Sequence, residues 1–100
     1  MPKPHSEFRL SPRAECDLEA IWLYTAQTWS ADQADTYHMQ IIARLERLAA
    51  GELQGNTCDY IRQGYFKLTA GSHLAFYRDA PYGIEIVRIL HQSMDFDRHL

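Results

Sequence analysis

Two stretches in the first half of the chain repeat apolar side chains at helical spacing. The first stretch covers residues 12–28, and its apolar stripe, which extends to the residue after it, consists of Ala14, Leu18, Ile21, Trp22, Thr25 and Trp29. The second stretch follows residue 30, and its stripe consists of Ala34, Tyr37, Ile41, Leu45 and Leu48. Because only a few residues separate the two stripes, the pattern predicts an antiparallel helical hairpin.

Residues with capping roles stand at the ends of both predicted helices. Ser11 is followed by Pro12, which lacks the N–H group that the first helical position leaves unpaired. Ser30 and Gln33 form a capping box, in which each side chain can bond the backbone N–H of the other residue. Gly51 suits the left-handed position after a last helical turn. These residues therefore predict where both helices begin and where the second one ends.

Shorter stretches with the alternation of strands flank this hairpin. Strands are predicted at Glu7–Leu10, Tyr65–Ala70, His73–Arg78 and Ile84–His91. The intervening Gly71-Ser72 fits a type II′ turn, and residues 80–83 fit a type I turn with Pro second and Gly last. Residues 51–62 are expected to form a polar loop and Met94–Leu100 a tail. The predicted fold is α+β: an N-terminal strand, the antiparallel helical hairpin and a three-stranded antiparallel meander, with the helices on one face of a small sheet.

The two-residue turn also predicts which strand residues share a face. The first face is expected to have an apolar centre of Leu74, Phe76, Val87 and Ile89 inside a rim of Tyr65, Lys67, Arg78, Glu85 and His91. The second face, expected to hold the helices, has Phe66, Leu68, Ala70, Ala75, Tyr77, Ile84, Ile86, Arg88 and Leu90. An apolar centre with a charged rim suggests a partner surface, unless Met94 and Phe96 of the tail cover it. A register slip of one residue would exchange the sides of the last strand.

Composition limits the class of protein. The chain has 100 residues, of which 46% are apolar and 23% charged, as in a single globular domain over residues 1–100 with a loose leader at 1–6 and a tail at 93–100. It lacks an apolar run of the length of a membrane span or signal peptide, so a cytoplasmic location is expected. Cys16 and Cys58 are expected to be free thiols there. The net charge of −3 argues against a general nucleic-acid binder.

The side chains give little indication of enzyme chemistry. The five His residues do not pair at metal-binding spacing, and no glycine-rich phosphate loop or serine-nucleophile motif is present. We therefore assign no catalytic residue, metal or cofactor. The basic side chains of the last part remain either contacts for an anionic partner or rim charges paired with nearby acids: Arg62, Lys67, Arg78, Arg88 and Arg98.

Several segments, in their order and spacing, resemble one protein family. They are residues 10–14 with Asp17-Leu18 and Ile21-Trp22, then residues 61–65, 71–73, 76–78, 86–92 and 94–100. From Phe8 onward the chain resembles the ParE toxins, the gyrase-directed branch of the RelE/ParE superfamily of type II toxin–antitoxin systems. The resemblance implies a helical hairpin on a small curved sheet, which agrees with the fold predicted from the pattern.

The resemblance also implies a function. It implies a non-enzymatic toxin that inhibits DNA gyrase, together with a ParD-type antitoxin that wraps the toxin in a hetero-oligomer and alone contacts operator DNA. The sister RelE branch cleaves messenger RNA on the ribosome, with arginines where this chain has Thr69 and Leu74 and a basic residue near Gln92. Only Lys67 keeps a charge among those face positions, and cleavage needs an acid, a base and cations. A RelE-type endoribonuclease, or an inactive binding module, is thus the alternative.

Two sets of contact residues are expected on this basis. The target-binding set is Arg88, His91, Asp95, Phe96 and Arg98. The antitoxin-binding set is Leu74, Phe76, Val87, Ile89, Lys67 and Arg78, together with the helical hairpin. Both sets depend on the register of the last strand and on the path of the tail.

Overall fold

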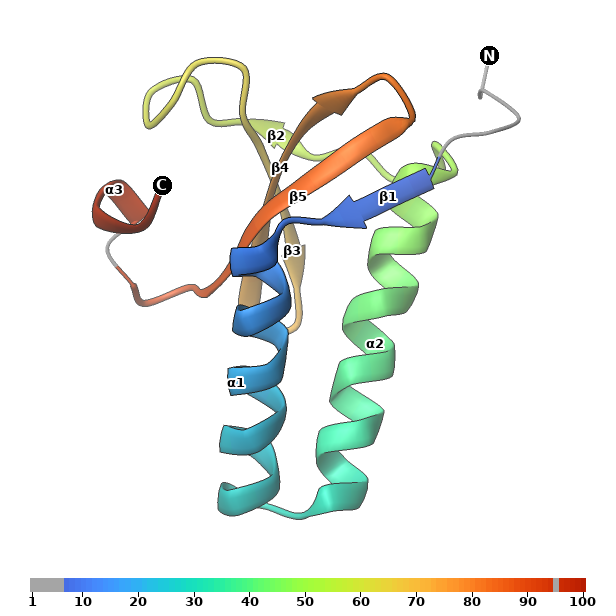
Figure 1. Ribbon diagram of the computed structural model, residues 1–100, viewed down its shortest axis with the longest axis vertical. Helices are drawn as coiled ribbons and strands as arrows, with labels where there is room; N and C mark the ends of the chain where they lie inside the picture. Colours follow the sequence, from blue (N-terminus) through green and yellow to red (C-terminus); the bar gives the residue numbers. More distant parts are fainter. Residues whose placement is uncertain (1–6, 95) are drawn as a thin grey trace.

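The computed structural model describes residues 7–94 and 96–100 as an open sheet with two long helices on one side (Figure 1). The elements are β1 (Glu7–Leu10), α1 (Pro12–Thr28), α2 (Ala31–Ala49), β2 (Asn56–Thr57), β3 (Phe66–Ala70), β4 (His73–Ala80), β5 (Gly83–His91) and α3 (Phe96–His99). The strand order is β1-β5-β4-β3-β2, with β1 parallel to β5 and the other neighbours antiparallel. The predicted α+β class is therefore confirmed.

The sheet is larger than the predicted meander, because β1 and β2 extend it at its two ends. β2 lies inside the stretch predicted as a polar loop, and α3 lies inside the predicted tail. Two paired residues and one helical turn are too short to leave a periodic pattern in the sequence. The predicted leader at residues 1–6 lies outside the described residues.

The predicted helix caps are confirmed. Ser11 Oγ accepts a hydrogen bond from the Ala14 N–H, and Ser30 Oγ accepts one from the Gln33 N–H, each at 3.0 Å. Gly51 has a φ of 83°, the left-handed conformation that glycine adopts without steric cost. Local chemistry therefore fixes the helix ends before any packing is considered.

Gly83 allows β1 to lie close to β5. It pairs with Glu7 across the parallel ladder and has a φ of 142°. A Cβ atom at this position would collide with the Glu7 carbonyl oxygen. The glycine that ends the predicted turn thus also makes room for the edge strand.

The main core fills the space between the helices and the sheet. Its buried residues are Ala14, Leu18, Ile41, Leu45, Leu48, Ala49, Leu68, Ala70, Ala75, Tyr77, Ile84, Ile86 and Ile89. Most of them come from the two predicted apolar stripes and from the predicted helix-facing side of the sheet. This side of the fold follows directly from the hydrophobic pattern.

A β-bulge in β5 changes the predicted faces of the last strand. Arg78 pairs with Glu85, as expected, but Tyr77 pairs with Ile86 and Phe76 with Arg88, which leaves Val87 without an opposite residue. The extra residue inverts the alternation beyond it. The prediction was therefore wrong for the second half of β5: Ile89 and His91 lie on the helix side, whereas Arg88 and Leu90 lie on the outer side.

The outer face of the sheet is covered rather than open. Cys58, Phe76 and Leu90 are buried there, and they pack with Ile61, Tyr65, Leu74, Phe96 and Leu100. The rings of Phe76 and Phe96 lie 4.9 Å apart between centroids. Phe96 thus covers the face as the alternative expectation stated, whereas Met94 remains 38% exposed. We call this second apolar group the outer cluster.

Candidate functional site

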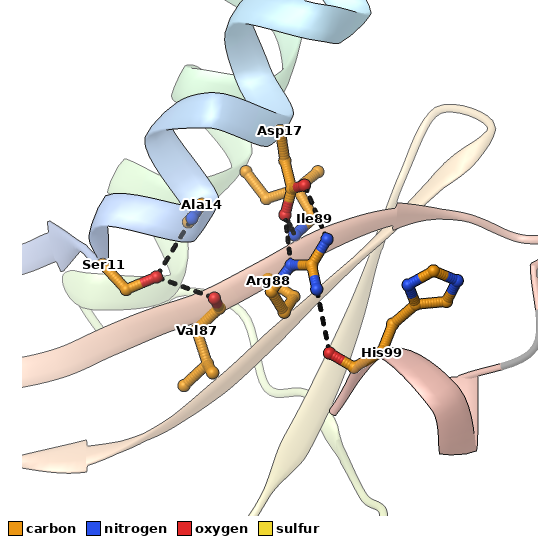
Figure 2. Close-up of polar contacts among 7 residues, drawn as sticks. All are labelled: Ser11, Ala14, Asp17, Val87, Arg88, Ile89 and His99. Carbon is orange, nitrogen blue, oxygen red and sulfur yellow. Dashed lines mark hydrogen bonds and ion pairs between the residues drawn. The ribbon is translucent and has the colours of Figure 1, made fainter.

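The N-terminal half of α1 lies along β5 where β1 has ended (Figure 2). Ser11 Oγ, besides capping α1, donates a 2.7 Å hydrogen bond to the Val87 carbonyl oxygen. The Ser11 N–H donates to the neighbouring Ile86 carbonyl oxygen at 2.9 Å. The bulge directs these two consecutive carbonyls to the same side, so a single serine can hold both.

Asp17 continues this contact nearly two helical turns further along α1. Its Oδ2 accepts the Ile89 N–H at 2.9 Å and Arg88 Nε at 2.8 Å, and its Oδ1 accepts Arg88 Nη2 at 2.9 Å. The carboxylate therefore binds the guanidinium at two points and also takes the place of a missing strand partner. The side chains of Arg88 and Asp17 are only 11% and 14% exposed.

Arg88 also connects β5 to the C-terminal helix. Its Nη1 donates to the His99 carbonyl oxygen at 2.9 Å, at the end of α3 (Figure 2). The hydrogen bonds that Arg88 donates to Asp17 raise the pKa of the guanidinium above its ordinary value, against the opposing effect of burial. Arg88 was expected among the target contacts, but its side chain is buried and joins α1, β5 and α3.

The other predicted target contacts lie in different places. His91 is exposed on the helix side of the sheet, away from the outer cluster. Phe96 is half-buried on Phe76, whereas Arg98 is exposed on α3 and also interacts within the chain. Asp95 lies outside the described residues. The structure thus brings Arg88, Phe96 and Arg98 to the α3 region and leaves His91 apart from them.

The predicted antitoxin contacts are also divided. Ile89 is 2% exposed in the main core, and Phe76 is fully buried in the outer cluster, so neither side chain presents a surface in this structure. Leu74 and Val87 are half-buried. Phe76 and Ile89 therefore act in packing, which corrects the expectation of an open apolar centre.

The outer face has a rim of cationic and aromatic side chains. Lys67 Nζ donates to the Tyr60 hydroxyl at 2.8 Å, and Tyr60 is itself 72% exposed. Arg78 Nε pairs with Glu85 Oε1 at 2.7 Å, which raises the pKa of the arginine. Arg62 donates to the Leu100 carbonyl oxygen and approaches the Tyr65 ring. Each of these cations therefore already has a partner within the chain.

A group of histidine and tyrosine side chains lies on the helix side, near the β3–β4 turn. The Tyr37 hydroxyl accepts the Ser72 N–H at 2.9 Å and lies 2.6 Å from His73 Nδ1. The His73 ring meets the His91 ring edge-on, with 5.3 Å between centroids. Burial, and then the nearby His91, lower the pKa of His73 while Asp17 opposes them. Neutral His73 can accept a hydrogen bond from the Tyr37 hydroxyl through Nδ1. The Tyr37 side chain thus holds α2 against the β3–β4 turn.

The described residues contain no cluster of side chains that could bind a metal ion. Within residues 7–94 and 96–100, no three His, Cys, Asp or Glu side chains come together as metal ligands. Helices in the same part of the chain are too short or too polar to cross a membrane. Cys16 and Cys58 are both free, as predicted, and burial raises the pKa of Cys58.

Comparison with known families decides which one this fold represents. A family model described as ParE toxin of type II toxin–antitoxin system, parDE, matches residues 8–96. The chain belongs to the ParE toxin family. The predicted resemblance is therefore confirmed, and the protein is a toxin of a type II toxin–antitoxin system.

Curated relatives of this ParE-family toxin cover almost its whole length. Toxin ParE1 of Mycobacterium tuberculosis is 48% identical over 96 residues, which are 95% of this chain and 98% of the relative. Toxin ParE1 of Caulobacter vibrioides is 41% identical over 93 residues, 93% of this chain and 96% of the relative. A solved chain of the chromosomal ParDE TA system from P. aeruginosa matches with a TM-score of 0.76 at 21% identity, over 87% of this chain and 96% of that chain. This last match supports the fold.

Asp17 is the important residue that sequence reasoning missed. It stands between Glu15 and Glu19 on α1, and neither predicted set of contact residues includes it. A usable signal was Arg88, the one charged residue in an otherwise apolar stretch of β5 from Ile86 to Leu90. A buried arginine requires a carboxylate partner, and Asp17 lies on the helix that packs on the strand.

Proposed function

We propose that this ParE-family toxin inhibits DNA gyrase by binding it, without breaking bonds, and that a ParD-type antitoxin neutralises it in a hetero-oligomer. The family match over residues 8–96 carries the proposal. The ParDE origin of the P. aeruginosa structure supports an antitoxin partner. Operator DNA is then contacted only through the antitoxin, and the toxin acts in the cytoplasm, where it meets gyrase.

The state of the basic side chains supports binding rather than RNA cleavage. A metal-independent nuclease needs cations that are available to the developing phosphorane charge. Arg88 is buried on Asp17, Arg78 is paired with Glu85, and Lys67 is bonded to Tyr60. The cations of the outer face therefore hold the protein together or lie in existing pairs.

We place the gyrase contact on the rim around α3 and the loop before β3. Tyr60 and Arg98 are exposed there, and exposed aromatic and arginine side chains are typical of binding hot spots. Lys67, which was expected among the antitoxin contacts, is half-buried beside Tyr60, and we assign it to the gyrase contact instead. Arg88 acts from beneath as a positioning residue, because it binds the last turn of α3 through His99. His91, on the helix side, is not part of this surface.

DNA supercoiling by purified gyrase tests the proposal. Inhibition by the toxin, and its reversal by the ParD-type antitoxin encoded beside it, are the expected results. Lys67→Glu should weaken inhibition about tenfold, because it reverses a charge on the contact surface. Arg47→Glu, a matched reversal at a cation paired with Glu52 at the end of α2, should leave inhibition unchanged.

Two results would contradict the proposal. One is unchanged supercoiling at a large molar excess of folded toxin. The other is codon-linked cleavage of translated messages after induction, measured by primer extension, which would favour the RelE-type endoribonuclease. Harmless expression of folded protein without antitoxin would instead indicate an inactive binding module.

A further inference from the structure

The two edges of the sheet are protected unequally. At one edge, β2 covers part of β3, and Arg44 of α2 covers the next position with two hydrogen bonds to the Thr69 carbonyl oxygen, at 3.2 and 2.9 Å. At the other edge, the Ser11 cap and Asp17 of α1 bind β5 beyond the end of β1. β1 itself remains as an edge strand without such a cover (Figure 1).

Half of the backbone groups of β1 are not used by its neighbour. The Glu7 N–H donates to the Tyr82 carbonyl oxygen of the turn before β5, at 3.1 Å. Since the backbone groups of successive strand residues point to opposite sides, those of Phe8 and Leu10 point away from β5. Among the residues that the structure describes, no strand lies on that side of β1. An edge of this kind can pair with a strand of another chain.

The exposed side chains of β1 make this edge complementary to itself. Phe8 and Leu10 pack on the main core, so Glu7 and Arg9 lie on the outer face, where their side chains are 54% and 64% exposed. The Arg9 guanidinium lies 4.1 Å from the centre of the Tyr82 ring, which keeps its charge on this face. The strand thus carries one negative and one positive charge, two residues apart, beside its free backbone groups.

These charges decide how two copies of β1 could pair. Only outward residues can form a hydrogen-bonded pair, so Phe8 must lie opposite Phe8 or Leu10 of a second copy in an antiparallel arrangement. Pairing centred on Leu10 would instead place Phe8 opposite Pro12, which already belongs to α1. Phe8 opposite Leu10 puts Arg9 opposite Arg9, and like charges directly opposite destabilise a sheet. Phe8 opposite Phe8 puts each Glu7 opposite an Arg9, which is favourable.

We propose that the free toxin binds a second copy of itself through β1, in an antiparallel pair centred on Phe8. The two Phe8 residues exchange both backbone hydrogen bonds, and each Glu7 carboxylate lies between its own Arg9 and that of the second copy. The contact joins the two five-stranded sheets into one, with both helical hairpins on the same side. Four-residue strands bury less than the roughly 1,200 Å² of a stable interface, so the dimer dissociates on dilution. This inference concerns the toxin alone and does not depend on the proposed function.

Sedimentation equilibrium of the full-length toxin, without antitoxin, tests self-association. Over about a hundredfold range of concentration, the average mass should rise from 11.6 kDa toward twice that value. A mass that stays at 11.6 kDa at every concentration overturns the inference and leaves the proposed function intact.

Two charge reversals test the pairing. Arg9→Glu leaves only carboxylates at the two positions and Glu7→Arg only cations, so each variant alone should associate at least about tenfold more weakly. An equimolar mixture should associate about as tightly as the unchanged toxin, because every facing pair again has opposite charges. Neither variant retains the ion pair of Arg9 with Glu7 within the chain, so recovery in the mixture reports contact between chains. A mixture of folded variants that stays monomeric overturns the inference.

A control variant separates this effect from a general change of charge. Arg47→Glu reverses a charge on α2 near Thr69, at the opposite edge of the sheet, and should leave the association unchanged. Thermal unfolding shows whether each variant is folded. Equal weakening by Arg47→Glu and Arg9→Glu overturns the assignment to β1.

Hydrogen exchange of the unchanged toxin, followed by NMR, tests the backbone contact. The amide of Phe8 should exchange about threefold more slowly at a concentration where about two-thirds of the chains are paired. The amide of Thr69, at the opposite edge, is the internal control and should not change with concentration. Self-association without slower exchange at Phe8 overturns pairing through β1.

Discussion

The two sides of the sheet are covered by different kinds of structure. On the helix side, two long amphipathic helices with their own caps bury a continuous core. On the outer side, a loop and one turn of helix cover Cys58, Phe76 and Leu90. Hydrogen bonds from Arg88 to His99 and from Arg62 to Leu100 hold that outer cover in place. The comparison teaches that apolar packing fixes the first side, whereas a few polar contacts position the second.

Truncation of the main core should have the largest effect. Leu45 is fully buried between the helices and the sheet. Leu45→Ala removes its apolar surface and leaves a cavity, so it should lower the free energy of unfolding by about 3–4 kcal/mol. Urea denaturation followed by circular dichroism measures this change. A loss below about 1 kcal/mol would show that the helix side does not depend on its core as the comparison requires.

Removal of the Asp17 carboxylate, which joins the two sides, should have the second-largest effect on stability. Asp17→Ala leaves Arg88 buried without its partner and unpairs the Ile89 N–H, so a loss of about 3 kcal/mol is expected. Arg78→Gln is the control, because the pair of Arg78 with Glu85 lies at the surface and should contribute less than about 1 kcal/mol. Chemical denaturation of both variants gives the two values. Equal losses would remove the distinction between the buried and the exposed ion pair.

Truncation in the outer cover should be milder. Phe96 is half-buried on Phe76, so Phe96→Ala should lower the free energy of unfolding by about 1–2 kcal/mol. Fluorescence-detected unfolding measures the loss, and hydrogen exchange shows whether α3 loosens while α1 and α2 stay protected. Exchange that rises equally in all three helices would mean that the two sides unfold as one unit.

The smallest expected effect is a pH dependence on the helix side. Burial lowers the pKa of His73 below its ordinary value of 6.5. As the pH falls, the unfolded chain therefore binds a proton at this histidine at a higher pH than the folded chain does. The contribution of neutral His73 to the free energy of unfolding is therefore complete above pH 6.5 and is lost as the pH falls below that value. His73→Gln should reduce the difference in unfolding temperature between pH 7.5 and about pH 5.5. An unchanged difference would exclude His73 as its source.

The same difference explains what the sequence could predict. The caps at Ser11 and Ser30 and the two apolar stripes act over a few neighbouring residues, so the hairpin could be predicted closely. The bulge at Val87 leaves no local mark, because the stretch from Ile84 to Leu90 reads as a strand in either register. Its position depends on bonds to Ser11 and Asp17, which lie more than seventy residues away in the chain. The outer cover depends on the same long-range contacts, so Ile89 and Arg88 were placed on the wrong faces.

The pairing of β1 with β5 has a consequence for synthesis on the ribosome. Ser11, which directly follows β1, bonds to Val87 at a sequence separation of 76 residues. The first strand therefore cannot pair until nearly the whole chain has been synthesised. A nascent chain that stops before Gly83 contains the helical hairpin but no partner for β1. Contacts this distant form late in folding, because a long loop must close first. Fragments released by premature termination would therefore lack the native sheet, and toxicity would be confined to translation products that extend through β5.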